Sequence, residues 1–121
     1  MESRSHIFPV GEKMNDTVEV SRDVFEPIAM LVREGLYKNE KDALKCLVLD
    51  QAASKIRQFD FKISEMRAKY KMSFEDFKRR IESRIGEEAF EEWDDFIIWE
   101  SYESARSYWR NVEARLKGLK A

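Results

Sequence analysis

The stretch GLYKNEKDAL, residues 35–44, decides how the first half of this chain is interpreted. Gly35 follows an apolar stripe at residues 24–32, and glycine readily adopts the left-handed conformation that ends a helix. Asn39 is a favoured residue at a helix N-terminus, and Asp42 would lie in the first turn, where negative charge is favourable. The stretch therefore predicts two helices that are separated by a short turn.

A short alternating segment precedes the first of these helices. Val18 and Val20 share one face of it, while Thr17 and Glu19 share the other, which is typical of a strand. Residues 1–14 show no periodicity, so we interpret them as a flexible arm that offers no second strand. Because the backbone groups of a strand need a partner, we expect that partner to come from a second chain.

Helical spacing of apolar residues continues through most of the remaining sequence. It runs past Ile56 to Tyr70, so the second helix is expected to be long. Ser73 predicts the start of a third, short helix with its stop at Gly86. After Gly86 the pattern indicates a final amphipathic segment, which is either one helix or two.

The order of strand, helix, glycine turn and capped helix in residues 16–55 resembles ribbon-helix-helix proteins of the Arc/MetJ type. The resemblance implies a homodimer in which one strand from each chain pairs across a two-fold axis, with Val18 and Val20 facing a shared core. We therefore expect a mainly α fold, in which the dimer module is followed by two or three amphipathic helices. The expected parts are the arm at 1–14, the module at 15–56 and a helical extension at 57–121.

Ribbon-helix-helix proteins usually bind DNA, and the resemblance implies which residues would make the contacts. The candidate DNA contacts are Lys13, Asn15, Thr17, Glu19 and Asn39. Glu19 repels phosphate, and Glu40 and Asp42 place negative charge at the helix end that the family uses to clamp phosphate. Operator binding by a transcriptional regulator is therefore the alternative hypothesis, beside a dimeric scaffold that does not bind DNA.

An acidic and aromatic segment, residues 87–103, contains no Lys or Arg. The candidate partner-binding residues in it are Phe90, Trp93, Phe96, Ile97, Trp99 and Tyr102. One interpretation is an arm whose aromatic side chains anchor a basic partner. The other is a helix that folds back with Phe90, Trp93 and Ile97 inward, in which case Phe96 and Trp99 need a different surface to cover them.

Residues 69–77, followed by this segment, look like antitoxins that append a toxin-binding arm to a ribbon-helix-helix dimer. That resemblance implies a small, basic protein toxin as the partner, often a ribonuclease with a basic active site. Our leading hypothesis is therefore an antitoxin-like homodimer that binds and neutralises a toxin through the acidic, aromatic C-terminal helices.

Other function classes find little support in the composition. His6 is the only histidine and it lies in the expected arm, so we predict neither catalysis nor a metal or cofactor. The net charge of −2 gives no global attraction to nucleic acid. The lone Cys46 favours a reducing compartment, and charges interrupt every apolar run before it reaches the length of a membrane span. We expect a cytoplasmic protein that does not bind membranes.

Overall fold

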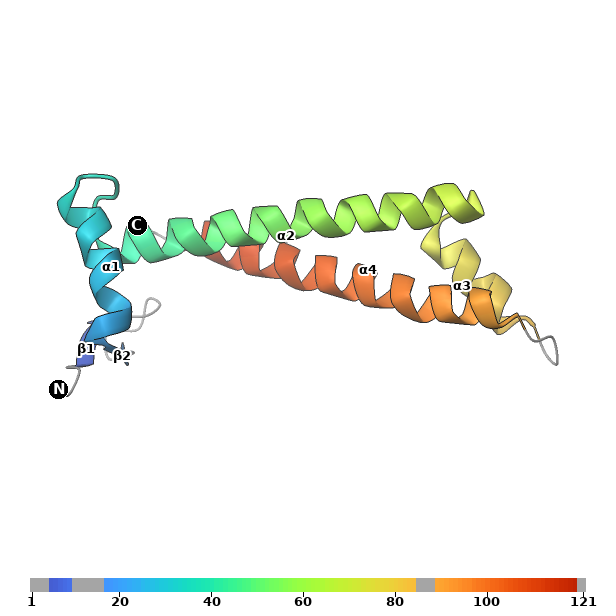
Figure 1. The fold of residues 1–121 in the computed structure, drawn as a ribbon, viewed down its shortest axis with the longest axis horizontal. Coiled ribbons are helices and arrows are strands. Elements are labelled where there is room, and N and C mark those ends of the chain that lie inside the picture. The colour runs from blue at the N-terminus through green and yellow to red at the C-terminus, as the bar shows by residue number, and fades with distance from the viewer. Residues whose placement is uncertain (1–4, 10–16, 85–88, 120–121) are drawn as a thin grey trace. The chain divides into compact units, whose positions relative to one another are not determined.

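The computed structural model describes residues 5–9, 17–84 and 89–119, which form two short strands and four helices (Figure 1). The elements are β1 (Ser5–Pro9), β2 (Thr17–Ser21), α1 (Arg22–Arg33), α2 (Glu40–Tyr70), α3 (Phe74–Glu82) and α4 (Phe90–Lys117). The chain is mainly helical, as predicted. It divides into two compact units, one of residues 1–51 with 113–121 and the other of residues 52–112.

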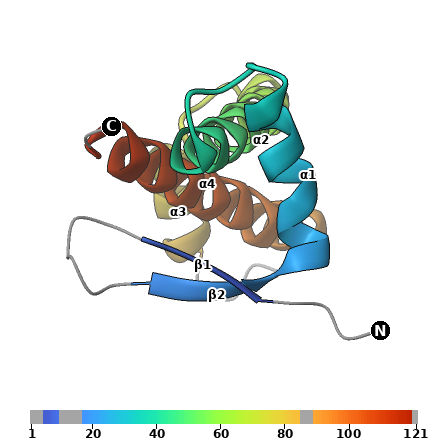
Figure 2. The same ribbon diagram turned by 90° about the vertical axis from the view of Figure 1, so that its left-hand side faces the viewer.

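The strand predicted at Thr17 has a partner within its own chain. β1 pairs antiparallel with β2, with Ser5 opposite Ser21 and Pro9 opposite Thr17 (Figure 2). The prediction of a flexible arm was therefore wrong at Ser5–Pro9, and so was the argument that β2 lacks an intrachain partner. The missing N–H of Pro9 is tolerated because β1 is an edge strand of a two-stranded sheet.

Gly35 ends α1 as predicted. Its φ of 80° is left-handed, and its N–H donates to the carbonyl oxygen of Val32 at 3.0 Å. The next amide, that of Leu36, donates to the carbonyl oxygen of Leu31 at 3.1 Å. These two hydrogen bonds form a Schellman motif, which satisfies carbonyl groups that the end of a helix otherwise leaves unpaired.

Asn39 caps α2, also as predicted. Its side-chain Oδ1 accepts a hydrogen bond from the Asp42 amide at 2.7 Å, while the Asp42 carboxylate accepts one from the Lys38 amide at 3.3 Å. The helix then continues for 31 residues, which confirms the predicted extension past Ile56. Among the described residues no helix is both long enough and apolar enough to cross a membrane.

In the second unit, α3 begins at the predicted cap, where the Ser73 hydroxyl accepts from the Asp76 amide at 3.2 Å. It ends at Glu82, earlier than expected, and the predicted stop at Gly86 lies outside the described residues. The final segment is one continuous helix, which decides between the two alternatives left by the sequence.

Within this unit α4 runs antiparallel to α2 (Figure 1). The Arg106 guanidinium lies 2.8 Å from Asp60, and Lys69 lies 2.6 Å from Asp95, so the chain directions are opposed. α3 covers the end of this helical pair. The core formed by the three helices contains the buried side chains Ile63, Phe77, Ile81 and Trp99.

Candidate partner-binding surface

The inner face of α4 carries three of the six residues predicted to bind a partner. Trp99 is fully buried, and its ring centroid lies 5.3 Å from that of Phe77 and 5.5 Å from that of Phe74. Phe96 stacks on Phe74 at 5.8 Å. Tyr102 packs against the same core, so all three aromatic residues face the core, with Trp99 buried and Phe96 and Tyr102 partly buried.

The other three predicted residues face outward. The exposed fractions are 72% for Phe90, 41% for Trp93 and 60% for Ile97. The second interpretation of the sequence, in which this stripe folds inward while Phe96 and Trp99 need another surface, was therefore wrong. Both stripes repeat at helical spacing, and the aromatic side chains of α3 are what cover the stripe that contains Trp99.

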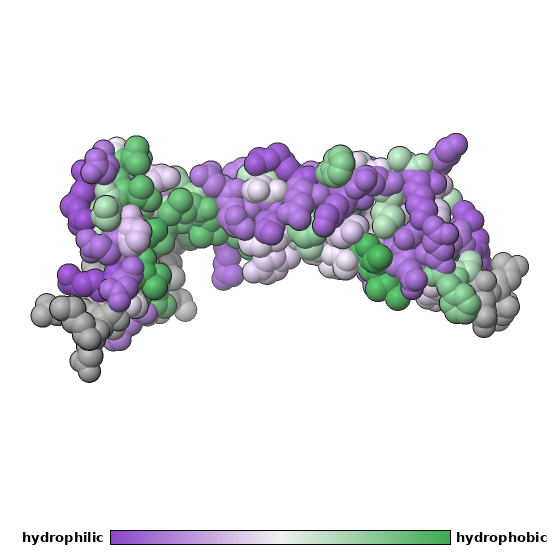
Figure 3. All heavy atoms as spheres, in the orientation of Figure 1, coloured by the Kyte–Doolittle hydropathy of each residue, from purple (hydrophilic) through white to green (hydrophobic). Residues whose placement is uncertain are grey.

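Ile98, which the prediction left out, is 40% exposed and extends the outward apolar surface. It was missed because it lies at the border of the stripe, one residue after Ile97. We call the four residues Phe90, Trp93, Ile97 and Ile98 the outer patch. Figure 3 shows hydrophobic atoms gathered over part of α4, within a surface that is mostly hydrophilic.

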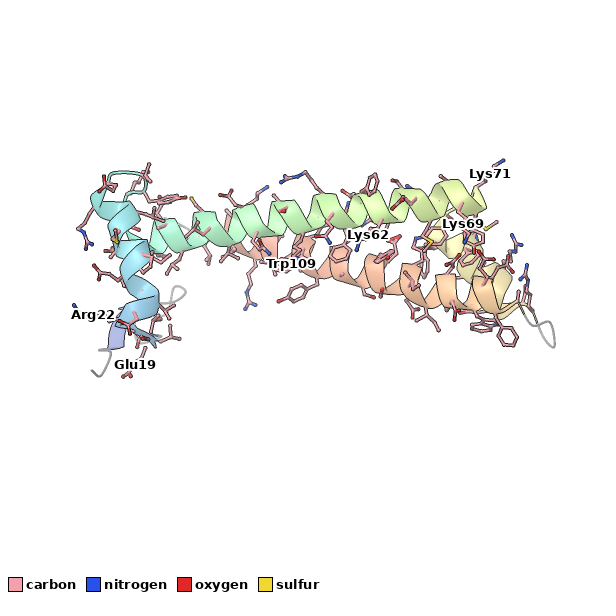
Figure 4. All side chains as sticks on the ribbon, viewed as in Figure 1. Glu19, Arg22, Lys62, Lys69, Lys71 and Trp109 are labelled. Carbon is pink, nitrogen blue, oxygen red and sulfur yellow. The ribbon has the colours of Figure 1, made fainter. Side chains whose placement is uncertain are left out.

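Ion pairs fix how α4 is rotated about its axis. Lys69 of α2 lies 2.7 Å from Glu91 and 2.6 Å from Asp95, and the Tyr70 hydroxyl donates to the same Asp95 oxygen. Lys62 lies over the ring of Tyr102, 5.2 Å from its centroid. Figure 4 shows Lys62 and Lys69 on the side of α2 that faces α4.

The contacts of Asp95 shift the pKa values of all three groups. Burial alone raises the pKa of Asp95, but the hydrogen bonds from Lys69 and Tyr70 outweigh it, so the net pKa is lowered. Burial, followed by the hydrogen bond to Asp95, raises the pKa of Tyr70 to about 12. The hydrogen bonds to Asp95 and Glu91 raise the pKa of Lys69. The carboxylate therefore stays ionised at neutral pH.

A second cluster joins α3 to α4. Arg80 lies 2.7 Å from Glu92, and Arg84 pairs with the same carboxylate. Part of the acidic segment therefore neutralises basic residues of the chain itself. By contrast, Asp94 and Glu100 are exposed, and neither forms an ion pair with another described residue. These two carboxylates remain available beside the outer patch.

The residues predicted to form the dimer or to contact DNA belong to the first unit, whereas the residues predicted to bind a partner belong to the second. Val18 of β2 is exposed and Val20 is half-buried, while Thr17 and Glu19 are both exposed. Asn39 is engaged as the cap of α2. The remaining two candidates, Lys13 and Asn15, lie outside the described residues.

Among the described residues no group of three or more His, Cys, Asp or Glu side chains is arranged to hold a metal ion. No protein-family model matches the sequence, and comparisons with curated proteins and with solved structures find no similar chain.

Proposed function

We propose that this chain is an antitoxin-like homodimer, and that the outer patch of α4 binds and neutralises a small basic protein toxin. The observation that carries the proposal is the division of α4 into two apolar faces. The inner face, with Trp99, completes the core of its own unit, while the outer patch is exposed.

The outer patch lies mostly outside the core of the unit that displays it, although the Trp93 ring meets the edge of the Phe96 ring with centroids 6.1 Å apart. Trp93, Ile97 and Phe90 are all at least 41% exposed, and Trp99 fills the core without them. Large apolar side chains that gather in a contiguous patch on a surface commonly mark an interaction site. Tryptophan is also prominent among the residues that contribute most to the free energy of binding at interfaces.

Charge defines the kind of partner. Asp94 and Glu100 flank the outer patch without an intrachain ion pair among the described residues. Carboxylates around an apolar patch steer a basic protein toward it and disfavour acidic proteins. This chemistry supports a partner such as a ribonuclease toxin, whose substrate-binding surface is basic.

Dimerisation would use the first unit, where burial is slight. Phe25 and Ala43 are its only buried hydrophobic residues among those described. Several large apolar side chains there are more than two-fifths exposed, namely Val18, Val24, Met30, Leu36 and Val48. A module this small rarely buries enough surface alone, and a second copy would cover these residues. The resemblance to ribbon-helix-helix proteins supports the same arrangement, with a second chain added beside β2.

Two observations favour toxin binding over operator binding. The exposed pair Thr17 and Glu19 offers no positive charge to DNA. At the start of α2, the Asp42 amide is already bonded to Asn39, and the Asp42 carboxylate would repel phosphate. DNA binding therefore ranks second as a function of this chain.

Growth in a bacterial host tests the proposal. The reading frame adjacent to this gene should encode a small basic protein that arrests growth, and co-expression of this chain should restore growth. The double variant Trp93→Ala, Ile97→Ala should lose this rescue. Phe61→Ala is the matched control, because Phe61 is 65% exposed in the same unit but lies on α2. Rescue by the double variant at normal expression would contradict the proposal.

A further inference from the structure

The outer patch is one end of a longer stripe along α4. Steps of three and four residues from Phe90 continue the same helix face as far as Tyr108. The stripe consists of Phe90, Trp93, Ile97, Ser101, Ser104 and Tyr108. All six residues are exposed, and they lie in the same unit. At 1.5 Å per residue the stripe is about 27 Å long, which is much more than a single anchor residue needs.

The side chains in the middle of the stripe are shorter than those at its ends, because Ser101 and Ser104 lie between larger residues. The middle of the stripe is therefore its low part. The Ser101 hydroxyl donates to the carbonyl oxygen of Ile98 at 2.6 Å. That hydroxyl is therefore already hydrogen-bonded within its own helix, and covering it with a partner costs little desolvation. A large side chain from a partner can pack against the two serines.

Acidic groups lie on both sides of the stripe. With a rotation of 100° per residue, Asp94 falls on one side of it and Glu100 on the other. Arg106 is the only Lys or Arg between residues 90 and 108, and it is bound on the inner face by Asp60 and Glu103, each at 2.8 Å. A second copy of this stripe would bring like charges together, so the complementary surface is basic.

We propose that the stripe from Phe90 to Tyr108 is a seat, that is, a docking surface, for one α-helix of the partner. That partner helix would carry an apolar stripe with Lys or Arg on both sides of it. The proposal rests on the proposed function, because it specifies how the toxin would be held. A helix satisfies its backbone hydrogen bonds internally, whereas an extended peptide would leave backbone groups unpaired over apolar side chains.

Two synthetic peptides of about 25 residues test the seat on the full-length protein. In the first, leucines are spaced by three and four residues and are flanked by Lys and Arg. The second has the same composition, but its leucines alternate with polar residues. We expect the first peptide to bind at least roughly tenfold more tightly in fluorescence anisotropy, and to gain helical circular dichroism on binding.

Ser101→Lys should weaken binding of the first peptide by roughly tenfold or more, because the lysine fills the low part of the seat. Ser64→Lys is the matched control. Ser64 is also exposed, and its hydroxyl donates to the carbonyl oxygen three residues earlier, that of Phe61, at 2.7 Å. Both variants add the same charge to the same unit. Equal affinity for the two peptides, or equal effects of the two substitutions, would overturn the seat.

The growth assay separates this inference from the proposed function. In one outcome, wild-type protein and Ser101→Lys both rescue growth, whereas the Trp93 and Ile97 double variant does not. The partner then binds the outer patch by another mode, and the helix seat is wrong. If wild-type protein does not rescue but the patterned peptide binds in the Ser101-dependent way, the seat holds and toxin neutralisation is wrong.

Discussion

Lys69 on α2 lies 2.6 Å from Asp95 on α4, measured from Nζ to Oδ2. Asp95 and Trp99 are four residues apart and therefore share one face of the helix. The ion pair at Asp95 and the burial of Trp99 hold α4 in the same rotation. The stripe that begins at Phe90 is consequently turned toward solvent.

Acid should remove the contribution of Asp95 to stability. Because its pKa in the folded protein is lowered from 3.8, the contribution is fully present above that value and is lost as the pH falls through the folded-state pKa. Asp95→Asn should lower the free energy of unfolding at pH 7 by about 1–3 kcal/mol. Urea unfolding at pH 7 and pH 3 measures this, and the difference between wild type and variant should shrink at the lower pH.

Asp94→Asn is the control for that substitution. Asp94 is exposed and forms no ion pair with another described residue, so its replacement should change the free energy of unfolding by less than about 0.5 kcal/mol. If the two asparagine variants had equal stability, the role assigned to the contact with Lys69 would be wrong.

Alkali should remove the contribution of Tyr70. The pKa of Tyr70 is raised from 10.0 to about 12, so its contribution is fully present below pH 10 and is lost as the pH rises toward 12. At pH 8, Tyr70→Phe should cost about 1 kcal/mol through the lost hydrogen bond to Asp95. The stability advantage of wild type over the variant should decline between pH 10 and 12 in urea titrations. Tyr108→Phe, at a tyrosine that is 60% exposed, is the control and should change the free energy of unfolding at pH 8 by less than about 0.5 kcal/mol.

Trp99 combines a large volume with an unmet polar group. Trp99→Ala should destabilise the protein by about 3–5 kcal/mol, because it empties the centre of the aromatic core. The Trp99 Nε1 is buried without a hydrogen-bond acceptor among the described residues. Trp99→Phe removes this unsatisfied donor and should therefore cost clearly less than the alanine variant. Thermal unfolding of the two variants compares them, and equal losses would contradict the prediction.

Gly35 should resist substitution because of its backbone conformation alone. Gly35→Ala should cost about 1–2 kcal/mol, because a φ of 80° is strained for a residue that has a Cβ. An added Cβ would meet no atom within 4 Å, so no steric clash contributes to this cost. Gly118→Ala is the control. Its Cβ would make ordinary contact with the Ala114 carbonyl oxygen at 3.5 Å and its φ is not left-handed, so a change below about 0.5 kcal/mol is expected. A chemical denaturation series on both variants measures the two effects.

The features that could be predicted from the sequence depend on neighbours three or four residues away. The caps at Asn39 and Ser73 and the stop at Gly35 are of this kind, because each hydrogen bond closes within one turn of helix. They set the helix boundaries without help from the rest of the fold.

The features that were missed depend on contacts between distant segments. The short strand at Ser5–Pro9 is recognisable only by its pairing with β2, whose paired residues lie eight to sixteen residues later in the chain. The choice of Trp99 over Trp93 for the core depends on Phe74 and Phe77, which pack on one side of α4. Helical spacing alone fits both tryptophans, so the sequence could not distinguish the buried face of α4 from its exposed face.

The outer patch of α4 carries the proposed function, and the affinity of the proposed partner for this chain tests the proposal most directly. The measurement is the dissociation constant of the purified adjacent gene product for wild type, Trp93→Ala and the control Phe61→Ala, with the melting temperature of each. We predict that Trp93→Ala weakens binding by roughly tenfold or more at a temperature where it remains folded, while Phe61→Ala binds like wild type. Equal affinity for all three proteins would contradict the account.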